Sequence, residues 1–286
     1  GDTSTGILAA LIAFHFRISV SHVEAGLRTQ DKYRPFPEEM NRQIICRLTD
    51  LHFAPTSSAR ENLLREGVSA DDIWVTGNTA IDALLYILKR QEDAGEAERM
   101  KELLKNKHGI VLGDKKIVIV TAHRRENFGK GLANIFGAVK EFAGKNPDLL
   151  FVIPVHPNPS VQAQAKEILQ NKGNIILTSP IAYEPFIYLM SRSYFILSDS
   201  GGIQEEVSIL GKPILVMREK TERGEGVSTG NAKLIGASRE AILESVSSLI
   251  NDKSVYESMS KKHTEYGDGT SCAKIADVIN EKFGGK

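Results

Sequence analysis

Short apolar runs alternate with longer amphipathic stretches along most of the chain. In the first half, residues 17–24, 50–55 and 72–77 have the length and composition of buried strands, with helical patterns near 37–48 and 57–66. In the second half we expect strands, most of them separated by helical stretches, at 116–121, 150–155, 174–178, 194–198, 212–217 and 232–235. Short buried strands joined by helices predict an α/β fold with parallel, doubly wound sheets.

Local signals place the helix ends and the domain boundaries. Ser58 and Glu61 have the spacing of a capping box, and Gly67 supplies a stop for the same helix. From about Asp82 to Lys107 the chain is helical and then charged, without a strand signal, and we expect the end of this stretch to be the linker between two domains. We therefore expect two Rossmann-like domains, with a last helix that packs back on the first of them, over residues 1–106, 107–269 and 270–286. The chain starts "GDTSTGILAALIAFHF", without Met and without a strand before its first turn, so we expect the first domain to be incomplete.

Composition narrows the classes of function. The 286 residues include 36 Lys plus Arg and 36 Asp plus Glu, a balance that argues against a nucleic-acid-binding protein. There is no apolar run long enough for a membrane helix and no signal peptide, so we expect no membrane partner. Cys46 and Cys272 lack the spacing of a metal site, which predicts reduced thiols, no metal and a cytoplasmic protein.

Charged and glycine-rich clusters follow several predicted strands, at the edge where such sheets bind ligands. "TAHRREN" places His123 and Arg124 after one strand, although a surface ion pair is the alternative interpretation. In "SDSGGIQEE", Ser200, Gly201 and Gly202 form a turn before a helix expected from about Ile203, whose free N–H groups would bind an anion such as pyrophosphate. Such a turn is also common as a simple tight connection.

Further candidates lie at the ends of other strands. Glu24 follows a buried strand, where a carboxylate that had no function would be energetically unfavourable. Glu38 follows Pro37, and a proline followed by acidic residues is also typical of an ordinary helix start. His156 lies in the stiff loop "PVHPNP", where a histidine that only caps the strand is an equal alternative. Arg223 lies in "TERGEG", which is composed like a loop that closes over a ligand, with a mobile surface loop as the alternative.

Seven motifs in matching order resemble the non-hydrolysing UDP-N-acetylglucosamine 2-epimerases: "GDTSTG", "HVEAGLRT", "PFPEEMNR", "VTGNTAIDAL", "TAHRREN", "PVHPNP" and "SDSGGIQEE". The resemblance covers essentially the whole chain. It implies the GT-B fold, with the substrate between two Rossmann-like domains. It also implies interconversion of UDP-GlcNAc and UDP-ManNAc at C2 through elimination and re-addition of UDP, without a cofactor.

The resemblance also assigns roles to residues. Asp2, Glu24 and Glu38 would form the acid/base set, without a division of the two roles among them, and His123 would contact the phosphate or the glycosyl oxygen. Arg124 and His156 would contact a second UDP-GlcNAc that acts as an allosteric activator. The substrate would be bound by Phe186 near the uracil, by Ser200, Gly201 and Gly202 at the pyrophosphate, by Glu206 at the ribose and by Arg223 at the phosphates.

The resemblance further implies a homodimer. Two departures limit it: the family's opening segment is absent, and Gly224 stands where the family usually has proline. A hydrolysing epimerase that releases ManNAc and UDP, a GT-B glycosyltransferase and a non-catalytic UDP-sugar-binding module remain as alternatives.

Overall fold

The computed structural model describes residues 1–170 and 173–284 and divides the chain into two compact units. Unit 1 comprises residues 1–85 and 264–286, and unit 2 comprises residues 86–263. The boundary lies within helix α4 (Thr79–Arg90), upstream of the linker expected from the sequence. Residues 285 and 286 of the predicted last segment, 270–286, lie outside the described residues.

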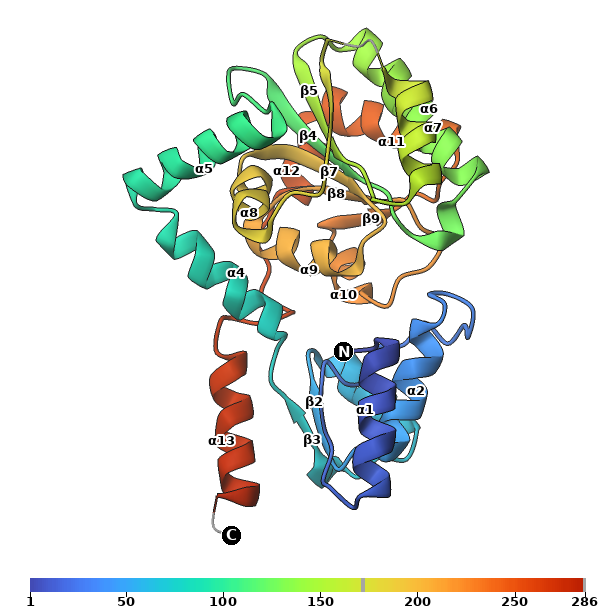
Figure 1. The fold of residues 1–286 in the computed structure, drawn as a ribbon, viewed down its shortest axis with the longest axis vertical. Coiled ribbons are helices and arrows are strands. Elements are labelled where there is room, and N and C mark those ends of the chain that lie inside the picture. Colours follow the sequence, from blue (N-terminus) through green and yellow to red (C-terminus); the bar gives the residue numbers. More distant parts are fainter. Residues whose placement is uncertain (171–172, 285–286) are drawn as a thin grey trace. The chain divides into compact units, whose positions relative to one another are not determined.

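Unit 1 contains a parallel three-stranded sheet in the order β1-β2-β3, formed by Ser21–Val23, Leu51–Ala54 and Ile73–Val75. Its helices are α1 (Ser4–His15), α2 (Glu38–Leu48), α3 (Ser57–Arg65) and α13 (Ser271–Phe283), with a 3₁₀ turn at Ala70–Asp72. Both faces of the sheet are covered, as Figure 1 shows within this unit. Helices α2 and α3 bury Cys46, Ala59 and Leu63 on one face, and α13 packs Ile275 beside Leu51 on the other.

The cap of α3 differs from the prediction. The N-cap is Thr56, whose hydroxyl accepts a hydrogen bond from the Ala59 N–H at 3.1 Å, and the helix begins at Ser57. The capping box predicted at Ser58 and Glu61 was therefore wrong by two residues, because the hydroxyl of Thr56 supplies the capping acceptor in place of Ser58. The predicted stop is confirmed, since Gly67 has a φ of +85° just beyond the helix.

Unit 2 contains a parallel six-stranded sheet in the order β6-β5-β4-β7-β8-β9. Its strands are β4 (Lys116–Thr121), β5 (Leu149–Pro154), β6 (Ile175–Thr178), β7 (Ser193–Ser198), β8 (Ile214–Val216) and β9 (Ala232–Leu234). Numbered from β4, this is the 3-2-1-4-5-6 order of the Rossmann fold. All six strands fall where the apolar runs predicted them, and the α/β fold class is confirmed.

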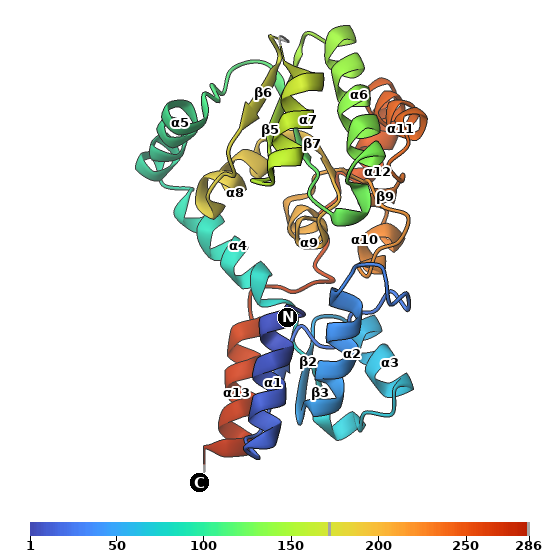
Figure 2. The same ribbon diagram turned by 45° about the vertical axis from the view of Figure 1, so that its right-hand side comes forward.

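Helices cover both faces of this sheet (Figure 1; Figure 2). Residues of α6 (Lys130–Lys145), α7 (Pro159–Leu169) and α11 (Arg239–Asn251) share one apolar core with the strands. The apolar residues of helices α8 (Tyr183–Ser191) and α9 (Gly201–Leu210) include several that are buried. The remaining elements are α5 (Ala94–His108), the 3₁₀ turn Arg125–Asn127, α10 (Gly224–Ser228) and α12 (Lys253–Met259).

Because parallel strands all end at one edge, the loops after β4, β5 and β7 are brought together in unit 2. The order of the strands reverses between β4 and β7, which is where doubly wound sheets bind ligands. Within residues 1–170 and 173–284, no helix combines the length and the apolar character needed to cross a membrane.

Candidate active site

The loops after β4 and β7 meet at the switch point of the unit 2 sheet. The two strands are neighbours, and the hydroxyls of Thr121 and Ser198 at their ends lie 2.7 Å apart. A pocket of about 210 Å³ opens beside them. It is lined by Thr121, Ala122, His123, Pro154, Val155, His156, Pro157, Pro180, Ile181, Phe186 and Ile203. The structure therefore brings His123, His156 and Phe186 to one pocket, from three separate segments of the chain.

Helix α9 presents its N-terminus at the same edge. The helix begins at Gly201, so the prediction of a start near Ile203 was wrong: both glycines occupy the first helical turn. Ser200 is the N-cap and makes no capping hydrogen bond through its side chain within the described residues. The first N–H groups of a helix lack partners inside the helix, and they favour an anion.

The two glycines have different surroundings. A Cβ at Gly201 would lie 2.9 Å from Arg223 Nη1 and 2.9 Å from Glu222 Oε1, whereas a Cβ at Gly202 would meet nothing within 4 Å. The backbone at Gly201 thus packs against buried charged side chains, and the backbone at Gly202 is open.

Glu206 and Glu205, neighbours on α9, have separate partners. Glu206 Oε1 accepts a hydrogen bond from the Tyr183 hydroxyl at 2.7 Å. Burial raises the pKa of Glu206, and the bond from Tyr183 opposes that rise. Glu205 is 1% exposed and accepts from Arg223 Nε at 2.8 Å. Glu205 is therefore committed to an ion pair inside unit 2.

Arg223 belongs to a buried ion-pair network. Its guanidinium contacts Glu205 and Glu222, and its side chain is 6% exposed. Glu222 also accepts from Arg218 Nη1 at 3.1 Å, and Arg218 Nε lies 3.1 Å from Glu126. This network joins α9, the loop after β8 and the 3₁₀ turn after β4. The loop that contains Arg223 is thus held inside the unit, and Gly224 forms the first residue of α10.

The buried carboxylate of Asp199 binds the backbone of His123 and Arg124. The His123 N–H and the Arg124 N–H donate to Asp199 Oδ2 at 3.0 and 2.9 Å, and His123 Nδ1 lies 3.2 Å from Asp199 Oδ1. The His123 and His156 rings are nearly parallel, with centroids 6.4 Å apart. The three predicted residues His123, Arg124 and His156 are therefore close neighbours.

In unit 1, two predicted carboxylates lie at the carboxyl edge of the small sheet. Glu24 directly follows β1 and has a φ of +70°, a left-handed conformation that costs a residue other than glycine roughly 1–3 kcal/mol. Its Oε1 accepts from Asn78 Nδ2 at 3.3 Å. Asp2 lies just before α1, and Asp2 Oδ2 pairs with Nε and Nη2 of Arg42, each at 2.9 Å.

Glu38 and Glu39 are the first two residues of α2, and their side chains have different surroundings. Glu39 is fully buried and accepts hydrogen bonds from the backbone of Thr29 and Gln30, so its role is to hold that loop. Glu38 has one buried oxygen, Oε2, without a hydrogen-bond partner among the described residues. Arg42, on the same helix as Glu38, pairs with both Asp2 and Glu39 and so links the carboxylates of this edge.

The sequence motifs did not indicate Asp199, Arg42 and Tyr183, which contact candidate site residues. The sequence could have indicated Asp199, because it is an acid that follows a buried strand, as Glu24 does. Arg42 and Tyr183 act on their partners across 40 and 23 residues of sequence, and no local pattern announces such contacts.

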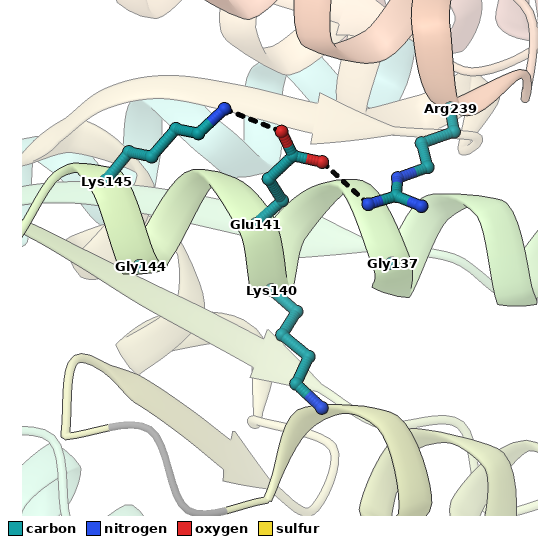
Figure 3. Close-up of a pocket in the computed structure, with 6 residues that line it drawn as sticks. All are labelled: Gly137, Lys140, Glu141, Gly144, Lys145 and Arg239. Atoms are coloured by element: carbon teal, nitrogen blue, oxygen red, sulfur yellow. Dashed lines mark hydrogen bonds and ion pairs between the residues drawn. The ribbon is translucent and has the colours of Figure 1, made fainter.

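A larger surface pocket, of about 520 Å³, lies on α6 away from this edge (Figure 3). Glu141 bridges Lys145 and Arg239 there, each at 2.7 Å, while Lys140 points away from it. Lys140, Glu141 and Lys145 belong to the second half of α6, which leads back toward the amino ends of the strands, and Arg239 is the first residue of α11. Within the described residues, no group of three or more His, Cys, Asp or Glu side chains is arranged to hold a metal ion.

Comparison with known proteins agrees with this architecture. Residues 1–280 match the family model described as UDP-N-acetylglucosamine 2-epimerase. A UDP-N-acetylglucosamine 2-epimerase of Campylobacter jejuni is 50% identical over 280 residues, which are 98% of this chain and 73% of that protein.

Two solved structures are also similar. The UDP-GlcNAc 2-epimerase of Neisseria meningitidis bound to UDP-GlcNAc has a TM-score of 0.95 and 43% identity, over 98% of this chain and 75% of that one. The Methanocaldococcus jannaschii UDP-GlcNAc 2-epimerase in complex with UDP-GlcNAc and UDP has a TM-score of 0.83 and 32% identity, over 98% and 74%. The resemblance seen in the seven motifs is confirmed: this chain belongs to the UDP-N-acetylglucosamine 2-epimerase family, with its GT-B fold.

Proposed function

We propose that this chain interconverts UDP-N-acetylglucosamine and UDP-N-acetylmannosamine by inverting C2. Family membership supports the activity, and the relative from Neisseria meningitidis has UDP-GlcNAc bound. The observation that carries the proposal is the arrangement at the switch point of unit 2. There the N-terminus of α9, His123 and an apolar pocket lie together, as a nucleoside diphosphate requires.

The proposal assigns the nucleotide to unit 2. The diphosphate lies on the N–H groups of Gly201 and Gly202 with Ser200 beside it, Glu206 accepts from the ribose hydroxyls, and Phe186 packs near the uracil. The Tyr183 bond to Glu206 Oε1 supports the ribose assignment, because it orients the carboxylate. Arg223 reaches a phosphate by exchanging one of its carboxylate partners for a phosphate oxygen.

The proposal assigns proton transfer at C2 to unit 1. A carboxylate removes the C2 proton, the C1–O bond breaks with its electron pair leaving on UDP, and a C1=C2 double bond forms. UDP then adds back at C1 while an acid delivers a proton to the opposite face of C2. Asp2, Glu24 and Glu38 form this acid/base set, and His123 meets the departing oxygen. No electron is gained or lost overall, so the reaction needs no redox cofactor.

Three further assignments belong to the proposal. A second UDP-GlcNAc binds beside Arg124 and His156 and activates the enzyme, which predicts slow turnover of UDP-ManNAc alone and acceleration by a trace of UDP-GlcNAc. The chain forms a homodimer, which sedimentation equilibrium tests directly. It works in the cytoplasm, where nucleotide sugars are made.

The test is proton NMR of the protein with UDP-GlcNAc in D₂O. We expect UDP-ManNAc to form and the C2 proton signal to disappear together, because each reversal exchanges that proton with solvent. Free ManNAc with UDP would instead identify a hydrolysing epimerase. UDP binding without C2 exchange would identify a non-catalytic module and contradict the proposal.

A further inference from the structure

Asp199 occupies a costly position that the proposed roles leave unexplained. It follows β7, between the end of a central strand and the N-cap of α9, and it is 0% exposed. A buried carboxylate must be compensated by hydrogen bonds or charge, because water no longer solvates it. Its partners therefore reveal what it does.

Within residues 1–170 and 173–284, the hydrogen bonds to the Asp199 carboxylate come from the loop after β4. The backbone N–H groups of His123 and Arg124 donate to Oδ2 at 3.0 and 2.9 Å, and Asn127 Nδ2 donates to the same oxygen at 3.0 Å. The Asp199 N–H in turn donates to the Thr121 carbonyl at 3.3 Å. One side chain thus ties the end of β7 to the loop after β4, across the switch point of the sheet.

The remaining contact fixes the His123 ring. Nδ1 lies 3.2 Å from Asp199 Oδ1, and the side chain remains 39% exposed. A carboxylate this close to Nδ1 favours a proton on that nitrogen, which leaves the lone pair of the neutral ring on Nε2. When Nε2 gains a proton, the same carboxylate stabilises the imidazolium. His123 also lines the pocket at this edge, so its ring is accessible to a ligand there.

The other charged or titratable groups around His123 act in the opposite direction. Burial lowers the pKa of His123, and Arg124, His156 and Arg218 lower it further, while Asp199 raises it. The acid therefore offsets the surplus of positive charge that surrounds the His123 ring.

We propose that Asp199 is a positioning residue of the epimerisation: it holds the His123 ring through Nδ1, so that Nε2 meets the oxygen of the departing diphosphate. This inference rests on the proposed function for its effect on rate. Its structural part, the tautomer and orientation of His123, stands on the geometry alone.

Asp199→Asn keeps the size of the side chain and one acceptor oxygen but removes the charge. We expect kcat to fall about 10- to 100-fold with KM changed less than about threefold, because the ring loses its orientation and the stabilisation of its protonated form. The matched control is Asn127→Ala, which removes a donor to the same carboxylate without touching the ring. Its kcat should stay within about threefold of the wild type.

A double-mutant cycle separates positioning from a general structural role. If Asp199 acts through His123, Asp199→Asn costs less than about threefold in the His123→Asn background. An equal loss in both backgrounds, or no loss with histidine present, overturns the inference.

Long-range ¹H–¹⁵N spectra of the histidine rings give a readout that does not need activity. We expect the Nδ1–H tautomer for His123 in the wild type and in Asn127→Ala, and a mixture in Asp199→Asn, with His123→Asn to assign the signal. An Nε2–H tautomer in the wild type would refute the inference even if Asp199→Asn failed to fold. Wild-type protein that shows the Nδ1–H tautomer but forms no UDP-ManNAc would refute the proposed function and leave the positioning of the ring established.

Discussion

The first glycine of α9 packs against the ion pair of Arg223 and Glu222, and its neighbour faces open space. A methyl group at Gly201 would lie 2.9 Å from both side chains, so Gly201→Ala must displace a buried pair. We expect the free energy of unfolding to fall by about 1–3 kcal/mol, measured by urea denaturation without ligand. The loss should exceed any gain in helix propensity from alanine.

Gly202→Ala is the matched control, because a Cβ at that position meets nothing within 4 Å. It places the same methyl group one residue along the same helix, and the free energy of unfolding should change by no more than about 0.5 kcal/mol. Equal losses in the two variants would show that the contact with the Arg223 pair is not what requires glycine at residue 201.

Glu206 predicts a pH dependence of stability. Burial raises its pKa above that of the unfolded chain, and Tyr183 offsets only part of the rise. The folded state therefore holds this proton more tightly, so the contribution of Glu206 to stability is fully present below the unfolded pKa and is lost as pH rises through the folded pKa. Glu206→Gln removes the charge, so it should stabilise the protein more at pH 8 than at pH 4 relative to the wild type. Urea denaturation at both pH values measures this difference, and a larger gain at pH 4 would show that the sign is wrong.

Residue chemistry could be predicted where the signal was local. His123 follows a strand and Glu206 lies in α9 beyond the two glycines, and their motifs marked both residues. Asp199 lies in the motif "SDSGG" and, like Glu24, is an acid at the end of a buried strand. The motif was interpreted only through its serine and glycines, so Asp199 was not predicted. Arg223 was expected in a loop that closes over a ligand, but it pairs with Glu205 and Glu222, and no pattern along the sequence shows that pairing in advance.

At the scale of elements, the start of α3 offers a direct comparison between expected and observed caps. Thr56 accepts the Ala59 N–H at 3.1 Å, whereas Ser58 lies inside the helix. Thr56→Ala should lower the free energy of unfolding by about 0.5–2 kcal/mol, because the N–H loses its acceptor. Ser58→Ala should cost less, and thermal unfolding of the two variants would reveal the order. A greater loss in Ser58→Ala would restore the capping box that the sequence suggested.

Elements were predictable where burial dictates composition. The strands of unit 2 are nearly continuous apolar runs because helices cover both faces of the sheet, so β4 stands out in sequence as "KIVIVT". Their ends were less predictable. Gly201 and Gly202 suggested a turn, since glycine is a poor helix former, but they occupy the first turn of α9, where a close neighbour at Gly201 leaves no room for a side chain.

At the scale of the whole molecule, the order of strands determines which loops meet. The alternation of strands and helices predicts a parallel doubly wound sheet, and the order β6-β5-β4-β7-β8-β9 then puts the loops after β4 and β7 side by side. That adjacency joins His123 to Asp199 across 76 residues of sequence. The sequence could supply the residues of each loop, but the partner of each loop depends on strand order, which is a property of the complete sheet.

The division of the proposed roles between two units can be tested by hydrogen exchange with two ligands. The proposed UDP contacts, such as Ser200 and Glu206, belong to unit 2, residues 86–263, whereas Asp2, Glu24 and Glu38 belong to unit 1. A ligand that binds only the folded state slows amide exchange in the elements that it stabilises. UDP should therefore protect the start of α9 and the loop after β4, with little effect on residues 1–85. UDP-GlcNAc, which adds the sugar, should protect in addition the segments around Glu24 and Glu38. Equal protection of residues 1–85 by both ligands would contradict this division, because the added effect of the sugar is what assigns the carboxylates to C2.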